Sequence, residues 1–304
     1  MKLKKHIRFF ILLCIAIYIL YVLYSASNIS IEEAYSEKKV VHFHCRFHYG
    51  DNIVNLKFFY NISQKLKENN IMIHYYYDNN QNKNAVEFQR YVDADTVTLR
   101  SISETPPESI ELWMGMEIDG VGHVDFDVYF PKFYTRILTA LNLQDQGIDV
   151  SLYQKEEYLL DIYNRVDDKY KDLDILILNS QPHSGQFPTY NIDTMNAMCR
   201  RLATKYKIAT STYVDDSIPC TFTDGLAIQD IGAISTHAKV IVAVFSGPII
   251  GCFNQYAKER VKKWILLLGH PVKFAEINIT LVDNVDAVDS VLQEVYGGYK
   301  EEAM

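Results

Sequence analysis

Two short segments, one in each half of the chain, combine a glycine with groups that can do chemistry. The first is His48-Tyr49-Gly50-Asp51-Asn52, which follows the apolar run Val40–Phe47. The second is Phe245-Ser246-Gly247-Pro248, which follows Val240–Val244. Each pattern predicts a strand, a tight glycine turn and the start of a helix. Free backbone N–H groups and the helix dipole at such a turn favour an anion.

Asp51 has two interpretations that the local sequence leaves open. Gly50 permits a tight turn, and Asp51 then lies at or beside the helix N-cap. There its carboxylate oxygen would accept hydrogen bonds from the free backbone amides of the first helical turn. In the functional interpretation, the carboxylate is a general base that faces a cleft. His48, Gly50 and Asn52 would then lie beside it on the acceptor side of the site.

The second glycine turn offers amides and no carboxylate. Ser246 can cap the following helix, and Gly247 lets a ligand approach the backbone. Pro248 fits the first helical turn, where no N–H is needed. These features predict a pyrophosphate-binding turn by the physics of other helix N-termini.

A third segment, Gln181-Pro182-His183-Ser184-Gly185, follows the predicted strand Ile175–Asn179. Ligands of α/β sheets bind at the carboxyl ends of parallel strands, where this polar loop would lie. His183 could contact a phosphate or donate to a sugar hydroxyl. Gln181, His183, Ser184 and Gly185 are therefore candidate donor-binding residues, and a plain surface turn is the alternative.

The sequence does not favour a metal or nucleic-acid site. His42 and His44 share one face of a predicted strand but lack Asp or Cys partners at ligand spacing, and the five cysteines form no CxxC pair. Asp125 and Asp127 are interpreted as loop or acceptor-site residues. The net charge is −8, and no basic stripe lies outside the extreme N-terminus, so nucleic-acid binding is not expected.

Alternating strands and helices must position these groups. Such alternation is typical of an α/β fold with a parallel sheet covered on both faces. A chain of 304 residues is long enough for two domains. We predict a boundary near Val150–Asp172, with one domain over 40–155 and a second over 165–300. The expected helices include Asn52–Lys67, Pro131–Leu143 and Ile249–Arg260.

The N-terminus carries a membrane signal. Residues 7–24 are apolar except for Arg8, and basic residues precede them. We predict a signal-anchor transmembrane helix over 1–25 and a stem over 26–39, with the body on the lumenal or extracytoplasmic side as in a single-pass type II protein. A cleaved signal peptide is the alternative, because Ser25-Ala26-Ser27 offers small residues.

In three places the chain resembles the heptosyltransferase-like glycosyltransferases, the GT-B group that includes the ADP-heptose transferases. Phe43–Ile53 is similar to that family's first strand and Gly-Asp turn. Ile175–Gly185 is similar to the strand and glycine loop that open its second domain. Leu226–Pro248 is similar to its helix, strand and Ser/Thr-Gly donor loop.

The resemblance implies two Rossmann-like domains, the N-terminal one (40–155) for the acceptor and the C-terminal one (165–300) for the donor. It also implies a nucleotide-diphosphate sugar in the cleft and metal-independent transfer without a cofactor. Asp51 would be the base, and the Ser246 and Gly247 amides would hold the diphosphate. The chain departs from the family at Phe245, where Asp is usual, and at Ile250, where His is frequent. The expected function is a membrane-anchored glycosyltransferase acting on a glycan or glycolipid. The alternative is a catalytically inactive GT-B-fold protein that binds glycans or nucleotides.

Overall fold

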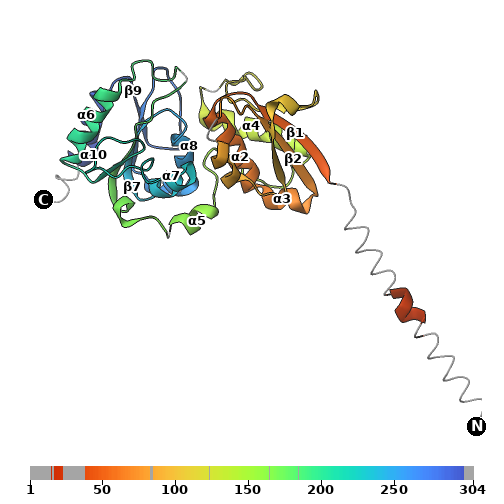
Figure 1. The fold of residues 1–304 in the computed structure, drawn as a ribbon. Helices are drawn as coiled ribbons and strands as arrows, with labels where there is room; N and C mark the ends of the chain where they lie inside the picture. The colour runs from red at the N-terminus through yellow and green to blue at the C-terminus, as the bar shows by residue number, and fades with distance from the viewer. Residues whose placement is uncertain are drawn as a thin grey trace, which may run out of the picture.

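The computed structural model describes residues 15, 17–22, 38–82, 85–122, 124–163, 165–183 and 185–297. It contains two parallel sheets, with strand orders β3-β2-β1-β4 and β6-β5-β7-β8-β9. Figure 1 shows one sheet in each half of the molecule. We call the elements from β1 to α4 the N-terminal half and those from β5 to α10 the C-terminal half. The predicted α/β class is confirmed.

The N-terminal half confirms the predicted strands and shifts the helices. Its elements are β1 (Lys39–Cys45), α2 (Tyr49–Asn61), α3 (Ser63–Glu68), β2 (Ile71–Tyr77), η1 (Ala85–Tyr91), β3 (Val97–Ser101), η2 (Ile102–Glu104), β4 (Ile110–Glu111) and α4 (Phe126–Leu141). The helix expected over 52–67 begins at Tyr49 and breaks at Ile62. Helix α4 begins before Pro131, because Phe126, Tyr129 and Phe130 extend its buried face toward the N-terminus.

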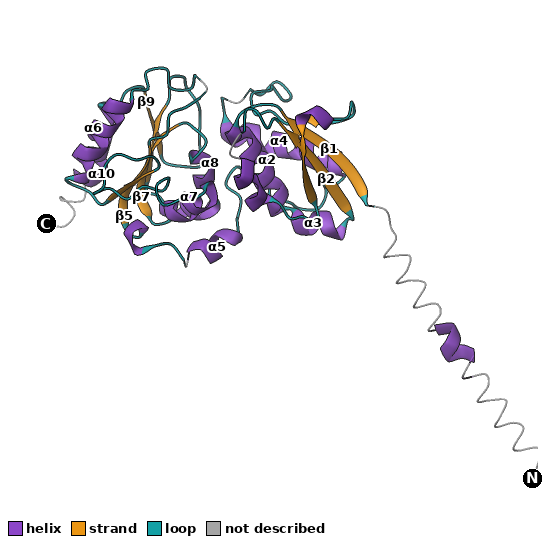
Figure 2. Ribbon diagram, in the orientation of Figure 1, coloured by secondary structure: helices purple, strands orange, loops and turns teal. Residues whose placement is uncertain are grey.

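Helices cover only one face of the N-terminal sheet in the described part of the chain. Phe43, Ile73 and Tyr75 are fully buried on the side of α2, which lies between this sheet and the C-terminal half (Figure 2). Helix α4 packs beside α2, with the Tyr134 ring 4.1 Å from that of Phe58. Val40 on the other face is 42% exposed. The prediction that both faces are covered is therefore wrong for this sheet.

The C-terminal half follows two connecting elements, α5 (Tyr158–Tyr163) and η3 (Asp168–Tyr170). Its elements are β5 (Leu173–Leu178), α6 (Ile192–Ala203), β6 (Ile208–Thr210), α7 (Ile228–Ser235), β7 (Ala238–Val244), α8 (Ile249–Cys252), α9 (Gln255–Arg260), β8 (Lys263–Leu267), β9 (Ile279–Val282) and α10 (Ala287–Gly297). Helices cover both faces of this sheet (Figure 2). The helix expected over 249–260 is broken at Asn254, whose side chain caps α9 through the Ala257 amide at 2.9 Å.

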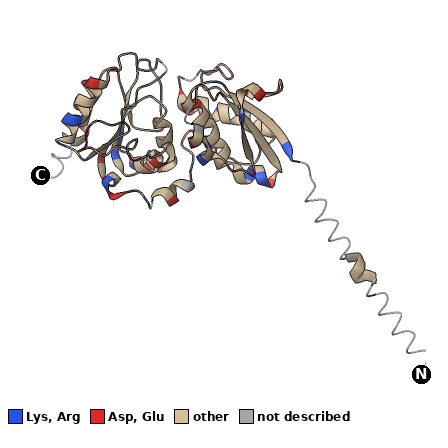
Figure 3. Ribbon diagram, in the orientation of Figure 1, with Lys and Arg blue, Asp and Glu red and all other residues tan. Residues whose placement is uncertain are grey.

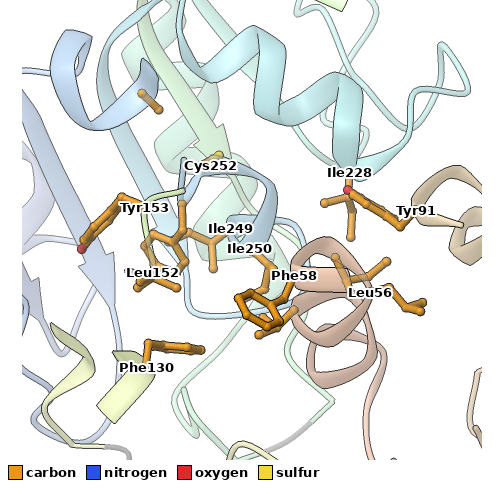
Figure 4. Close-up of a cluster of buried hydrophobic side chains, with 14 of the residues drawn as sticks. Leu56, Phe58, Tyr91, Phe130, Leu152, Tyr153, Ile228, Ile249, Ile250 and Cys252 are labelled. Atoms are coloured by element: carbon orange, nitrogen blue, oxygen red, sulfur yellow. The ribbon is translucent and has the colours of Figure 1, made fainter. Parts of the chain in front are cut away.

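One hydrophobic core joins the two halves. Leu56 and Phe58 of α2 belong to the same buried cluster as Ile228 of α7 and Ile249 of α8 (Figure 4). Beside it, Lys57 is buried and donates to the Ile250 and Phe253 carbonyls at 2.9 and 3.1 Å, and it pairs with the Glu156 carboxylate at 2.6 Å. A helix of one half is thus fixed to the carboxyl end of a helix of the other.

The described residues contain no helix long and apolar enough to span a membrane. Most of the predicted anchor over 1–25, and all of the stem over 26–39 except its last two residues, lie outside the described residues. The anchor, the stem and the boundaries 40–155 and 165–300 stay predictions.

Candidate functional site

The two glycine turns meet where the two halves touch. A Cβ atom placed on Gly50 would lie 3.7 Å from the Gly247 Cα and 3.7 Å from the Ile250 side chain. A Cβ atom placed on Gly247 would lie 3.7 Å from the Tyr49 ring. The start of α2 therefore faces the turn before α8 directly. The two segments that the sequence singled out form one site.

Asp51 is a buried carboxyl group in this site. It lies in the first turn of α2, while His48 is the N-cap residue, so the expected place at the cap is corrected by three residues. Asp51 is 7% exposed, and burial raises its pKa to about 6, against the opposing effects of the His48 imidazole and the Met114 amide. The His48 Nδ1 atom lies 3.8 Å from the carboxylate. A carboxyl group with this pKa is a competent base near neutral pH.

A buried amide network fixes the first turn of α2. The Asn52 side chain is fully buried and donates to the Phe47 and His48 carbonyls at 3.2 and 3.0 Å. The Tyr75 hydroxyl donates to Asn52 at 2.8 Å and accepts from Asn55 at 3.0 Å. Asn52, predicted on the acceptor side, thus holds the turn from inside the core. His48 and Gly50 lie at the surface of the site.

The Ser246 turn is held by backbone hydrogen bonds and keeps the Ser246 hydroxyl free. The Phe245 amide donates to the Leu267 carbonyl at 3.2 Å, and the Ile249 amide donates to the Ser246 carbonyl at 3.2 Å. The Ser246 hydroxyl is buried and has no hydrogen-bond partner among the described residues. Pro248 is the N-cap residue of α8. Ser246 therefore does not cap the helix as expected, and its hydroxyl is left for a ligand.

Phe245 has a structural explanation. Its ring lies 5.6 Å from that of Phe126, which in turn lies 4.8 Å from that of Phe274. Phe126 comes from α4 of the N-terminal half, so this aromatic group joins the two halves beside the turn. An aspartate at this position would place a charge among aromatic rings.

Hydroxyl and amide groups gather at the carboxyl ends of β5 and β6. The buried Asn179 side chain accepts from the Thr212 amide at 2.9 Å, and the Ser180 and Ser211 hydroxyls are 2.9 Å apart. The Thr212 hydroxyl is buried and lacks a partner in the described part of the chain. Sequence reasoning missed these residues, although a pair of short polar side chains after each apolar strand was a visible signal.

A cleft of about 160 Å³ lies between the two halves at this place. The N-terminal half contributes Tyr49 and Glu87. The C-terminal half contributes hydroxyl groups and an apolar wall, and the lining consists of Tyr49, Glu87, Ser180, Ser211, Thr212, Thr221, Phe222, Leu226, Ile228, Ile231 and Pro248. This lining holds one carboxylate and no Lys or Arg. The cleft is smaller than the roughly 300–1,000 Å³ of a typical ligand pocket.

The predicted donor loop lies apart from this cleft. Gln181, His183 and Gly185 are exposed and are not among the lining residues, and Ser184 lies outside the described residues. The loop continues to Gln186, whose carbonyl accepts from the Gly269 amide at 2.6 Å. The structure thus brings the turns that carry Asp51 and Ser246 together through the contact of Gly50 with Gly247, and it leaves the predicted loop at the surface. Pro248 lines the cleft, whereas Asp51, Ser246 and Gly247 are not among its lining residues.

No group of three or more His, Cys, Asp or Glu side chains that could hold a metal ion occurs within the described ranges. The His42 imidazole instead pairs with the Tyr76 hydroxyl at 2.9 Å. Asp127 accepts hydrogen bonds from the Ala275 and Glu276 amides, so this carboxylate joins the two halves. Figure 3 shows positive and negative residues interspersed over both halves.

No protein-family model and no curated protein matches the chain. A glycosyl transferase family 9 structure from Veillonella parvula DSM 2008 matches with 10% identity and a TM-score of 0.45, over 85% of this chain and 89% of that one. E. coli heptosyltransferase WaaC with ADP matches with 9% identity and a TM-score of 0.46, over 84% of this chain and 99% of that one.

The dodecameric iron-containing heptosyltransferase TibC, in complex with ADP-D-beta-D-heptose, matches with 9% identity and a TM-score of 0.35, over 77% of this chain and 59% of that one. WaaC and TibC are heptosyltransferases, the group that the three sequence motifs resemble. A likeness this distant assigns neither an activity nor a substrate to the chain.

Proposed function

We propose that this chain is a glycosyltransferase that moves a sugar from a nucleotide-diphosphate donor to a hydroxyl group of a glycan or glycolipid. The observation that carries the proposal is the contact between the Gly50 and Gly247 turns. This contact brings the helix turn that carries the buried Asp51 carboxyl group to the turn that carries the unpartnered Ser246 hydroxyl.

Asp51 takes the proton of the acceptor hydroxyl, and the acceptor oxygen forms its bond to the anomeric carbon. The bond from that carbon to the diphosphate breaks, and the nucleoside diphosphate leaves with the electron pair. The Ser246 hydroxyl, the amides of Ser246 and Gly247 and the N-terminus of α2 meet the charge that develops on the leaving group. This scheme requires no metal and no cofactor.

The proposal includes the membrane placement expected from the N-terminal sequence. An anchor over residues 1–25 holds the body on the extracytoplasmic side, close to a lipid-linked acceptor. The support is the basic residues followed by the apolar run.

A binding protein of the same fold without catalysis is the second candidate. The favouring observations are the absence of Lys and Arg from the lining of the cleft and its volume of about 160 Å³. A diphosphate in this cleft meets dipoles, hydroxyls and the Glu87 carboxylate but no cation, which suits weak binding better than leaving-group stabilisation.

Sugar-nucleotide hydrolysis by purified protein separates the two candidates. The wild type, Asp51→Asn and the exposed control Asp145→Asn are each given a panel of sugar nucleotides, and melting temperatures are recorded with the matching nucleoside diphosphates. Transfer predicts nucleotide release that Asp51→Asn abolishes and Asp145→Asn retains. A rise in melting temperature without release in any protein supports the binding protein. If no sugar nucleotide is hydrolysed and no nucleoside diphosphate raises the melting temperature, both candidate functions are refuted.

A further inference from the structure

A carboxylate of the N-terminal half bridges the cleft between the two halves. Glu87, on the short helix η1, accepts hydrogen bonds from the Tyr49 hydroxyl and from the backbone amide of Ile228, the first residue of α7. All three residues line the cleft. Glu87 therefore spans it from one wall to the other.

The neighbouring turn of η1 is fixed to the same helix. Arg90 pairs with Asp230 at 2.8 Å, and the Gln229 side chain donates to the Arg90 carbonyl at 2.8 Å. Asp230 also accepts from the Ala227 amide at 2.8 Å. The segment η1 thus lies across the first turn of α7 and contacts it through polar, partly exposed groups that exchange readily with water. Phe88 and Tyr91 of the same segment are fully buried and hold it to the core.

A second cavity begins beyond these contacts. It has a volume of about 730 Å³ and is lined by Arg90, Gln229 and Asp230 together with residues of the segments 162–170 and 224–234. Leu226 lines both cavities. The contacts of η1 with α7 therefore border both spaces, with Glu87 and Ile228 on the cleft and Arg90, Gln229 and Asp230 on the second cavity.

We propose that Glu87 is a displaceable gate of the cleft, and that a phosphate-bearing ligand enters by replacing its carboxylate on the Tyr49 hydroxyl and the Ile228 amide. The proposal rests on the function proposed above and adds its regulation. The two groups that Glu87 engages are hydrogen-bond donors, and they already bind an anion in the structure. A phosphate oxygen satisfies the same two donors by charge-assisted hydrogen bonds, and a neutral ligand makes only weaker ones.

The apparent affinity for the ligand equals the affinity of the open form multiplied by the fraction of molecules in which the gate is open. We expect Glu87→Ala to bind nucleoside diphosphates about tenfold more tightly than the wild type. Glu87→Gln, which keeps the size of the side chain and loses its charge, should lie between the two and serves if the alanine variant fails to fold. Glu117→Ala is the matched control, because Glu117 is an exposed glutamate of the same half outside this cleft.

Two measurements are made on each protein. Hydrogen exchange of residues 85–92 without ligand reports whether η1 has been released, and calorimetric titration with ADP, GDP, UDP and CDP reports binding. The proposal expects faster exchange and tighter binding in the Glu87 variants and neither change in Glu117→Ala.

Unchanged exchange in residues 85–92 overturns the gate. Faster exchange together with equal or weaker binding of a nucleotide that the wild type binds overturns it as well. If exchange rises and no nucleoside diphosphate binds any of the proteins, Glu87 is confirmed as the contact that holds η1 in place. The proposal that the donor is a nucleotide-diphosphate sugar is then refuted.

Discussion

Asp51 links function to stability at the scale of a single residue. Its folded pKa of about 6 lies above the ordinary value of 3.8, so the folded protein holds this proton more tightly than the unfolded chain does. The stability that this bound proton gives the folded state is full below pH 3.8 and is lost as the pH rises through about 6. At about 1.4 kcal/mol for each pH unit between the two values, the buried charge costs roughly 2–3 kcal/mol at neutral pH.

We therefore expect Asp51→Asn to melt at a higher temperature than the wild type at pH 8, with a difference that shrinks between pH 6 and pH 4. Calorimetry across this range checks the expectation, with Asp145→Asn as the control. A difference that stays constant with pH contradicts the assigned burial of the charge.

Two buried tyrosines offer a comparison of one hydroxyl that has partners with one that has none. The Tyr75 hydroxyl joins Asn52 to Asn55, whereas the Tyr129 hydroxyl is buried without a partner among the described residues. Tyr75→Phe leaves two amides unsatisfied and should cost about 1–3 kcal/mol, while Tyr129→Phe should be neutral or stabilising. Urea unfolding of both variants measures this, and equal losses would count against the network.

At the scale of elements, glycines set the distance between α7 and α8. A Cβ atom on Gly251 would lie 2.4 Å from the Ile228 carbonyl oxygen, and one on Gly232 would lie 2.7 Å from the Gly251 carbonyl oxygen. Gly251→Ala must push the two helices apart, and we expect a loss of about 1–3 kcal/mol in the free energy of unfolding.

Gly122→Ala is the control for this change, because a Cβ atom there meets nothing within 4 Å. Its effect should stay within about 0.5 kcal/mol. Equal losses from both substitutions, measured by urea unfolding, would show that the helix contact is looser than described.

The elements that local sequence dictates were predictable, and the contacts between elements were not. The apolar runs of β1 and β7, each followed by a glycine turn, place Asp51 and Ser246 at strand ends without knowledge of the fold. Glu87 carries no comparable signal, because its two donors come from segments distant in sequence. The helix expected over 249–260 is broken because the Asn254 side chain caps a new helix. An asparagine side chain can bond to nearby backbone amides in this way instead of allowing the helix to continue.

At the scale of the whole molecule, the shared core predicts that the two halves unfold together. The chain has two tryptophans, Trp113 in the N-terminal half and Trp264 in the C-terminal half. Trp264 is fully buried, and Trp113 stacks on Phe47 with ring centroids 4.3 Å apart. Each half therefore carries its own fluorescent reporter.

We expect Trp113→Phe and Trp264→Phe, each followed in urea through its remaining tryptophan, to show one transition that coincides with the loss of helical circular dichroism of the same variant. If the Trp113 and Trp264 signals change at different urea concentrations from the circular dichroism, the halves unfold separately and the core between them is weaker than its burial implies.

The sheet with one uncovered face has a consequence for how this protein can vary in evolution. Along β1 and β2, Phe43, Ile73 and Tyr75 face the helices, and Val40, His42 and His74 face outward. Near the start of these strands, neighbouring codons are therefore under different selection, since Val40 is exposed while the positions that face the helices must keep their shape. Near their ends, His44 and Tyr76 are buried on the outer face as well and are constrained. A new recognition surface could arise on this face by substitutions that leave the core and the cleft untouched.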